Sequence, residues 1–114
     1  MDGQYNERIL RIINKTLSLN FPDYRGAYLY GSRLRCDCAP DSDFDVVLLF
    51  DRIDFEKKLL IAGVIGDIEY DQDIFIDYKL FTTSGEKSIE HIRSLVNPFF
   101  IREAIDKGVF YGRQ

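Results

Sequence analysis

Apolar side chains recur at helical spacing between residues 5 and 20, and this pattern predicts an amphipathic helix. The positions that carry it are Ile9, Ile12, Ile13, Thr16 and Leu17. Pro22 and Gly26 then interrupt the pattern. A second helix is expected over residues 54–69, with Asp54 as its N-cap. Its apolar side is expected to carry Phe55, Leu59, Leu60 and residues 62–64.

Short apolar segments between these helices predict β-strands. Residues 27–30 are apolar and aromatic, and the strand predicted there ends at Gly31. Residues 43–50 begin with acidic positions and are apolar on both faces from Val46 onward. Such a run is typical of a central strand that is covered by helices. The two strands are expected to be neighbours in one sheet.

Residues 73–81 alternate in character and are expected to form a further strand. The face that includes Asp77 also carries Phe75, Lys79 and Phe81. The polar residues 32–42 are expected to contain a loop, and Thr83 and Glu86 have the spacing of a helix capping box.

The last third of the chain is expected to be mainly helical. The helix after the capping box is interrupted at residues 97–98, and a short helix then runs to Gly108. Residues 109–111 are expected to add a short terminal strand. Taken together, these elements predict an α+β fold, with a small mixed β-sheet and helices packed mainly on one face.

The composition is that of an ordinary globular protein. The chain has 114 residues, of which 46% are hydrophobic and 30% charged, so one domain is expected over residues 1–114. A net charge of -4 argues against broad nucleic-acid binding, which depends on clustered Lys and Arg. No signal peptide or membrane-spanning run is visible, so a cytoplasmic location is expected. We interpret Cys36 and Cys38 as reduced loop cysteines, because a zinc site would need further ligands and His91 is the only histidine.

Two carboxylates at the head of a predicted strand are the first candidates for chemistry. Asp43 and Asp45 lie two positions apart, so their side chains share one face of the strand. Like charges at this spacing repel each other unless a cation lies between them. Carboxylate oxygens suit Mg²⁺, which completes its coordination shell with water and phosphate oxygens.

A solvated acidic loop is the alternative interpretation of residues 41–45. A calcium-binding loop is rejected, because Val46 stands where glycine is needed and Arg52 stands where the bidentate glutamate should be.

The turn before this strand has the residues of a phosphate site. Gly31 allows the backbone to approach a ligand closely, and the N–H groups of the turn and the Ser32 hydroxyl can donate to phosphate oxygens. Arg33 and Arg35 are candidate phosphate contacts, although surface arginines are common. Ser42 is a further candidate nucleotide contact.

Asp77 interrupts an apolar run and is expected to have a partner, either a metal ion or a basic side chain. If its strand lies beside residues 43–50, its carboxylate would stand about 5 Å from theirs. It would then bind a metal ion or accept the proton of an attacking hydroxyl.

Together these residues resemble the nucleotidyltransferase superfamily typified by DNA polymerase beta, and especially its minimal stand-alone branch. The family pattern is Gly-Ser, a short basic stretch, a spacer, and Asp-x-Asp opening an apolar strand, and here it spans residues 31–47. The ending of the chain, residues 105–112, also looks like that of the minimal branch. The chain departs from the pattern at Leu34 and Cys36, where the family often has Ala and Gly.

The resemblance implies a nucleotidyltransferase-like fold and transfer of a nucleoside monophosphate, commonly AMP from ATP, with release of pyrophosphate. Asp43 and Asp45 would hold two Mg²⁺ ions, for which Mn²⁺ can substitute, and Gly31 and Ser32 would hold the β and γ phosphates.

The third carboxylate of the family is assigned less directly. Asp77 is the preferred position, where it would bind one metal or act as base, and Asp73 and Asp71 are the alternatives.

Members of the minimal branch are often paired with a helical partner of the HEPN group in toxin–antitoxin-like modules, where the transferase adds AMP to the partner. The resemblance therefore implies that a partner protein, or a homo-oligomer, supplies acceptor recognition. Two alternatives remain. One is a catalytically weak or inactive antitoxin that neutralises its partner by contact. The other is a transferase for a small molecule or an RNA end, although the net negative charge disfavours RNA.

Overall fold

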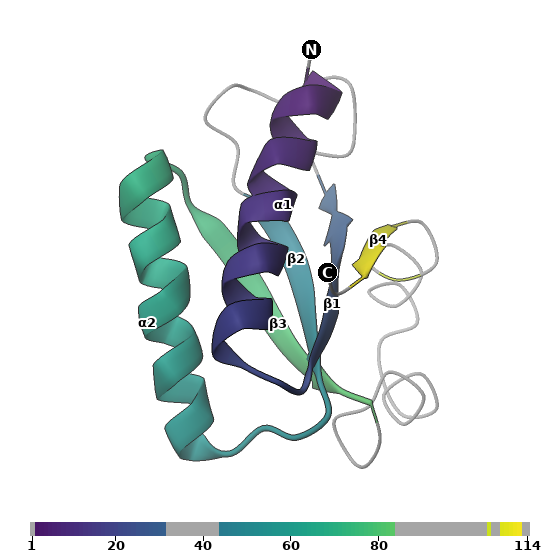
Figure 1. Cartoon of the computed structure of the whole chain (residues 1–114). Helices are drawn as coiled ribbons and strands as arrows, with labels where there is room; N and C mark the ends of the chain where they lie inside the picture. Colours follow the sequence, from purple (N-terminus) through teal and green to yellow (C-terminus); the bar gives the residue numbers. More distant parts are fainter. Residues whose placement is uncertain (1, 32–43, 84–104, 106–107, 113–114) are drawn as a thin grey trace.

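The computed structural model describes residues 2–31, 44–83, 105 and 108–112. In this part of the chain, two helices lie on one face of a single mixed sheet (Figure 1). The elements in chain order are α1 (Asp2–Asn20), β1 (Tyr24–Tyr30), β2 (Phe44–Phe50), α2 (Phe55–Gln72), β3 (Ile76–Thr82) and β4 (Val109–Gly112). The predicted α+β fold class is therefore confirmed. Neither described helix is long and apolar enough to cross a membrane.

The strand order within the described sheet is β3-β2-β1-β4. β1 runs antiparallel to both β2 and β4, whereas β2 and β3 are parallel. Parallel neighbours need a crossover connection, and here α2 provides it. The predicted pairing of the first two strands and the short terminal strand are both confirmed.

Strand boundaries differ from the prediction at their starts. β1 begins at Tyr24 and continues through Gly26, where its register with β2 shifts. Gly26 has φ +148, and a Cβ atom there would lie 2.8 Å from the Phe110 ring. Gly26 is therefore a residue of β1 at which the pairing with β2 is irregular, and the prediction that the strand begins after Gly26 is wrong. β3 begins at Ile76, later than predicted, because the preceding residues complete the end of α2.

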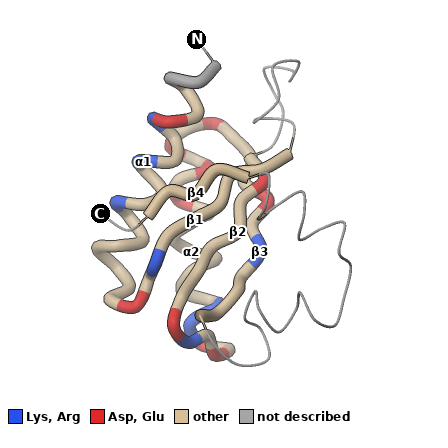
Figure 2. Tube along the Cα trace, turned by 90° about the vertical axis from the view of Figure 1, so that its right-hand side faces the viewer, with Lys and Arg blue, Asp and Glu red and all other residues tan. Residues whose placement is uncertain are grey.

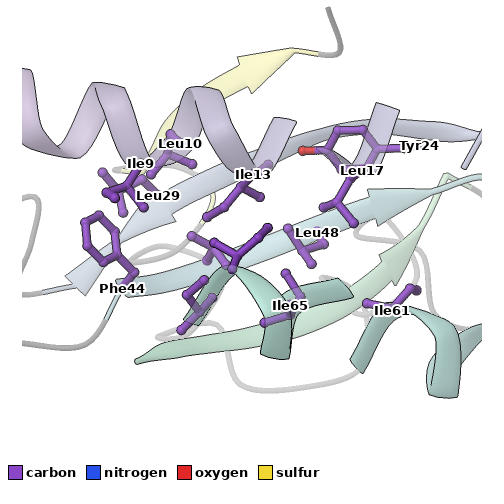
Figure 3. Close-up of a cluster of buried hydrophobic side chains, with 14 of the residues drawn as sticks. Ile9, Leu10, Ile13, Leu17, Tyr24, Leu29, Phe44, Leu48, Ile61 and Ile65 are labelled. Carbon is purple, nitrogen blue, oxygen red and sulfur yellow. The ribbon is translucent and has the colours of Figure 1, made fainter. Parts of the chain in front are cut away.

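The main core lies between the helices and the sheet (Figure 3). α1 contributes Ile9, Leu10, Ile13 and Leu17, which are all fully buried. β2 contributes Phe44, Val46, Leu48 and Phe50, which alternate along the strand and face the helices. The remaining apolar residues of β2, with Tyr30 and Phe81, form a second cluster on the opposite face, so β2 is buried on both sides as predicted.

The buried face of α2 differs from the prediction. Phe55, Leu59 and Leu60 are 76%, 58% and 57% exposed, whereas Ile61, Ile65 and Ile68 face the core. Apolar residues surround much of this helix, so the sequence pattern does not select one side. The branched isoleucines that recur every three or four positions are the ones that pack on the sheet.

A side chain caps the start of α2, and a backbone N–H caps its end. The Asp54 carboxylate accepts a hydrogen bond of 2.8 Å from the Lys57 N–H, which confirms the predicted N-cap. The helix continues beyond the predicted residue 69 to Gln72, and Asp73 ends it in the left-handed conformation with φ 54. The loop predicted over residues 32–42 and the helices predicted between residues 83 and 108 lie outside the described residues or almost entirely so.

Asn14 links three elements in the interior. Its amide nitrogen donates to the carbonyl oxygens of Tyr111 and Gly112, at 3.3 and 3.1 Å. Its side-chain oxygen accepts the hydrogen bond of the Tyr24 hydroxyl. Asn14 is only 1% exposed, so these groups have no access to water that could replace the bonds. One α1 side chain thus attaches β4 and β1 to the helix layer.

We predict that Asn14→Ala lowers the free energy of unfolding by about 1–3 kcal/mol, because it leaves a buried tyrosine hydroxyl without its acceptor. Urea denaturation of the two proteins measures the change. Asn20→Ala is the matched control. Asn20 is exposed, and its side chain donates to the Thr16 carbonyl oxygen within the same helix, so its loss should cost less than about 0.5 kcal/mol. Equal losses in the two variants would contradict this account of Asn14.

Candidate active site

The candidate site lies at the end of the sheet where β1 finishes and where β2 and β3 begin. Tyr30, the last residue of β1, is paired with Asp45 of β2, and Asp45 is paired with Asp77 of β3. Paired residues on neighbouring strands project to the same face, and the strands are about 4.8 Å apart. Two predicted site carboxylates are therefore on neighbouring strands at the same level. Figure 2 shows acidic segments near the starts of β2 and β3.

Backbone contacts fix the register that brings the two carboxylates together. The Phe44 N–H donates to the Phe75 carbonyl oxygen at 2.9 Å, just before the Asp45–Asp77 pair. The Ile76 N–H donates to the Glu69 carboxylate of α2, also at 2.9 Å. Because the residues immediately before the pair are held in both strands, a slip of β3 by one residue would break these bonds and turn Asp77 to the helix face.

Gly31 accommodates the carboxylate of Asp45. Its backbone has φ +81, a conformation that favours glycine. A Cβ atom at position 31 would collide with Oδ2 of Asp45 and lie 3.1 Å from its Cγ. The Asp45 carboxylate therefore lies directly against the glycine backbone. This contact joins the predicted phosphate turn to the predicted metal ligand, as the layout of the motif requires.

Lys79 and Tyr30 belong to the same group of side chains, although sequence reasoning gave neither of them a role. The Lys79 Nζ lies 3.9 Å from the Asp77 Oδ2, and its positive charge also acts on the Tyr30 hydroxyl. Burial raises the pKa of Tyr30; Lys79 opposes this rise, and the charges of Asp45 and Asp77 add to it. The alternation of side chains along the strand places Lys79 on the same face as Asp77. This was the sequence signal that could have assigned Lys79 to the site.

The described site residues differ in their access to solvent. The side chains of Asp77 and Lys79 are 55% and 43% exposed, whereas Tyr30 is buried and Asp45 is half-buried. The site thus has a closed side next to β1 and an open side at β3. A ligand can approach the carboxylates from the open side without rearrangement of the core.

The donor set fits a hard divalent cation. Asp45 and Asp77 offer adjacent carboxylate oxygens, and such like charges become compatible when a cation lies between them. Asp43 would fall on the same face by strand alternation, but it lies outside the described residues. Among the residues that the structure describes, no group of three or more His, Cys, Asp or Glu side chains is placed to hold a metal. The two acidic residues alone therefore provide part of a coordination shell.

Several predicted site residues lie outside the part of the chain that the structure describes. Those outside the described residues are Ser32, Arg33, Arg35, Ser42 and Asp43, together with Cys36, Cys38 and His91. The alternatives for the third carboxylate are described. Asp71 lies in the last turn of α2 and Asp73 is its C-cap, so neither belongs to β3, whereas Asp77 is the strand residue in register with Asp45.

Comparison with known proteins identifies similar sequences and folds. The family model described as Polymerase beta, Nucleotidyltransferase matches residues 11–108. The solved structure of a toxin–antitoxin pair, MntA–HpeT, carrying two aspartate-to-glutamate substitutions, has a similar fold. Its TM-score is 0.55 at 18% sequence identity, and the match covers 92% of this chain and 74% of that chain. A search among curated proteins found no significant match.

We predict that Gly31→Ala weakens the binding of Mn²⁺ by about 10- to 100-fold, because the added methyl group displaces the Asp45 carboxylate. The left-handed backbone should also cost about 1–2 kcal/mol of stability. Titration followed by electron paramagnetic resonance measures the cation affinity, and urea denaturation measures the stability.

Gly66→Ala provides the matched control for this prediction. A Cβ atom there meets nothing within 4 Å, and the residue lies inside α2. Alanine should therefore stabilise the protein by about 0.5–1 kcal/mol and leave Mn²⁺ binding unchanged. Wild-type Mn²⁺ affinity in Gly31→Ala would show that the contact with Asp45 does not position the carboxylate.

Proposed function

This chain is a nucleotidyltransferase of the polymerase beta nucleotidyltransferase family, and we propose that it transfers AMP from ATP to a hydroxyl group of a partner protein. Mg²⁺ would be held by Asp43, Asp45 and Asp77, and pyrophosphate would be released. The observation that carries the proposal is the pairing of Asp45 with Asp77 directly beside the Gly31 backbone.

The arrangement suits nucleotidyl transfer because the candidate metal ligands lie beside a turn that has room for a triphosphate. Gly31 has no side chain, so the turn can accept a triphosphate close to its backbone, and Ser32 would donate its hydroxyl there. Bound at the carboxylates, divalent ions would neutralise the phosphates and the charge that develops on the leaving pyrophosphate.

Each described acidic residue has a distinct place in this proposal. Asp45 is half-buried and held against Gly31, so it is suited to be a fixed metal ligand. Asp77 is more than half exposed on the open side of the site, where an acceptor hydroxyl can approach. It would bind one metal or accept the proton of that hydroxyl.

A protein acceptor is favoured by the likeness to a toxin–antitoxin pair. In that structure two aspartates two positions apart were replaced by glutamate, which is the spacing of Asp43 and Asp45 here. The low identity supports the fold alone, so the partner is our proposal: a small helical protein of the HEPN group. The chain would act as the antitoxin by modifying that partner.

A contact-only antitoxin is the second candidate, and one observation favours it. Phe55, Leu59 and Leu60 are exposed on the outer side of α2, where they could bury apolar area against another protein. Neutralisation by contact would need no intact carboxylates. The two candidates therefore respond differently to the same substitutions.

We predict that Asp45→Asn and Asp77→Asn each lower AMP transfer by about 10²-fold or more, because they remove charge that stabilises the metal-bound triphosphate. The assay incubates the protein and its helical partner with α-labelled ATP and Mg²⁺, and measures the label on the partner. Chelation of the metal should abolish labelling.

Asp67→Asn is the control for the loss of one negative charge, because Asp67 is exposed on α2 away from the paired strands. It should transfer AMP at the wild-type rate. Partner inhibition that persists in Asp45→Asn, with no label in any protein, would support the contact-only antitoxin instead.

A further inference from the structure

The candidate site contains a cation of its own. Lys79 lies two residues after Asp77 on the same face of β3, and its Nζ is 3.9 Å from the Asp77 Oδ2. The charge of Lys79 also acts on the hydroxyl of Tyr30, the strand partner of Asp45. The positive charge of Lys79 is therefore felt both by Asp77 and by the strand that ends at Gly31. Figure 2 shows a basic segment within β3, the strand that carries Lys79.

The two contacts of Lys79 differ in strength. A separation of 3.9 Å is an ion pair but exceeds the usual length of a direct hydrogen bond. Both partners are about half exposed, so water screens their attraction and the pair contributes little to stability. Such a pair can be broken at low cost. Tyr30, in contrast, is buried and held in its strand, so the phenol on which the charge of Lys79 acts has a fixed position.

We propose that Lys79 is the resident counter-ion of Asp77 in the nucleotide-free protein, that it competes with a divalent cation for this carboxylate, and that it moves to a phosphate oxygen when metal and triphosphate bind together. The movement of Lys79 to a phosphate oxygen rests on the proposed function. The competition with a divalent cation concerns only Lys79, Asp77 and the cation.

The physical reason is the balance of charge around the two carboxylates. With Lys79 in place, a divalent cation at Asp77 meets a positive charge only a few ångströms away, so its binding is opposed. A triphosphate brings negative charge into the site and gives the flexible lysine a new acceptor. The repulsion between Lys79 and the metal ion is then replaced by an attraction between Lys79 and the phosphate. Metal and nucleotide should then bind with positive coupling, in which each raises the affinity for the other.

The test uses Lys79→Met, which keeps the apolar stem and removes the charge, and Lys79→Arg, which keeps the charge. Mn²⁺ binding without nucleotide is measured by electron paramagnetic resonance on the full chain. Lys79→Met should bind Mn²⁺ about two- to fivefold more tightly than the wild type, the factor that corresponds to removing an exposed ion pair. Lys79→Arg should stay near the wild type. Lys58→Met, on exposed α2 surface, is the control and should leave the affinity unchanged.

A second titration measures the coupling. Binding of a non-hydrolysable ATP analogue with Mn²⁺ should be about tenfold weaker in Lys79→Met, because a phosphate contact of roughly this worth is lost, and Lys79→Arg should recover most of the affinity. Lys79→Met thus improves the binding of metal alone while it weakens the binding of metal with nucleotide. A residue that merely holds Asp77 in place would weaken both.

The outcomes separate this inference from the proposed function. Unchanged, weaker or undetectable Mn²⁺ binding in Lys79→Met overturns the counter-ion role, whatever the protein does with ATP. Tighter Mn²⁺ binding together with unchanged analogue binding overturns the movement to phosphate. Failure of AMP transfer to any partner, with both titrations as expected, would overturn the proposed acceptor and leave the role of Lys79 supported.

Discussion

The parallel register of β2 and β3 is the constraint on which the candidate site depends. It places Asp45 and Asp77 at the same level on adjacent strands, where two negative side chains share one face. Like charges directly opposite each other on neighbouring strands destabilise a sheet. Here the Gly31 backbone lies against the Asp45 carboxylate, and Lys79 balances part of the charge of Asp77. In the proposed function a divalent cation would offset the remaining repulsion, so a pairing that is unfavourable for stability alone would provide the metal ligands.

The remainder of the described fold keeps this register in place. α2 crosses from the end of β2 to the start of β3, and three isoleucines on one side fix it to the sheet. Its Glu69 carboxylate accepts the Ile76 N–H at the first residue of β3. At the opposite end of the sheet, Arg25 forms a two-point ion pair with Asp51, which also accepts the Thr83 hydroxyl. These contacts hold the strands in register at both ends of the sheet. The stability that they provide offsets the repulsion between the two carboxylates at the site end.

Much of this arrangement could be predicted from the sequence because strand periodicity is local. Alternation placed Asp77 and Lys79 on one face, and the apolar run after Asp45 indicated a central strand. The buried side of α2 could not be found in this way, since apolar residues occur around much of that helix and only its contacts with the sheet select Ile61 and its neighbours. Lys79 was missed for a different reason. Alternation places Lys79 on the face of Asp77 but does not show how far its side chain reaches, and Tyr30 comes under its charge only when β1 packs beside β2.

We propose that Asp45 and Asp77 share a divalent cation beside Gly31. The most direct measurement is a crystal structure of the protein with Mn²⁺ and a non-hydrolysable ATP analogue, in which anomalous scattering locates the metal. We expect a Mn²⁺ ion about 2.1 Å from carboxylate oxygens of both residues, with the triphosphate against the Gly31 turn. A metal and triphosphate bound elsewhere, with Asp77 still beside Lys79 and no cation between the two acids, would contradict it.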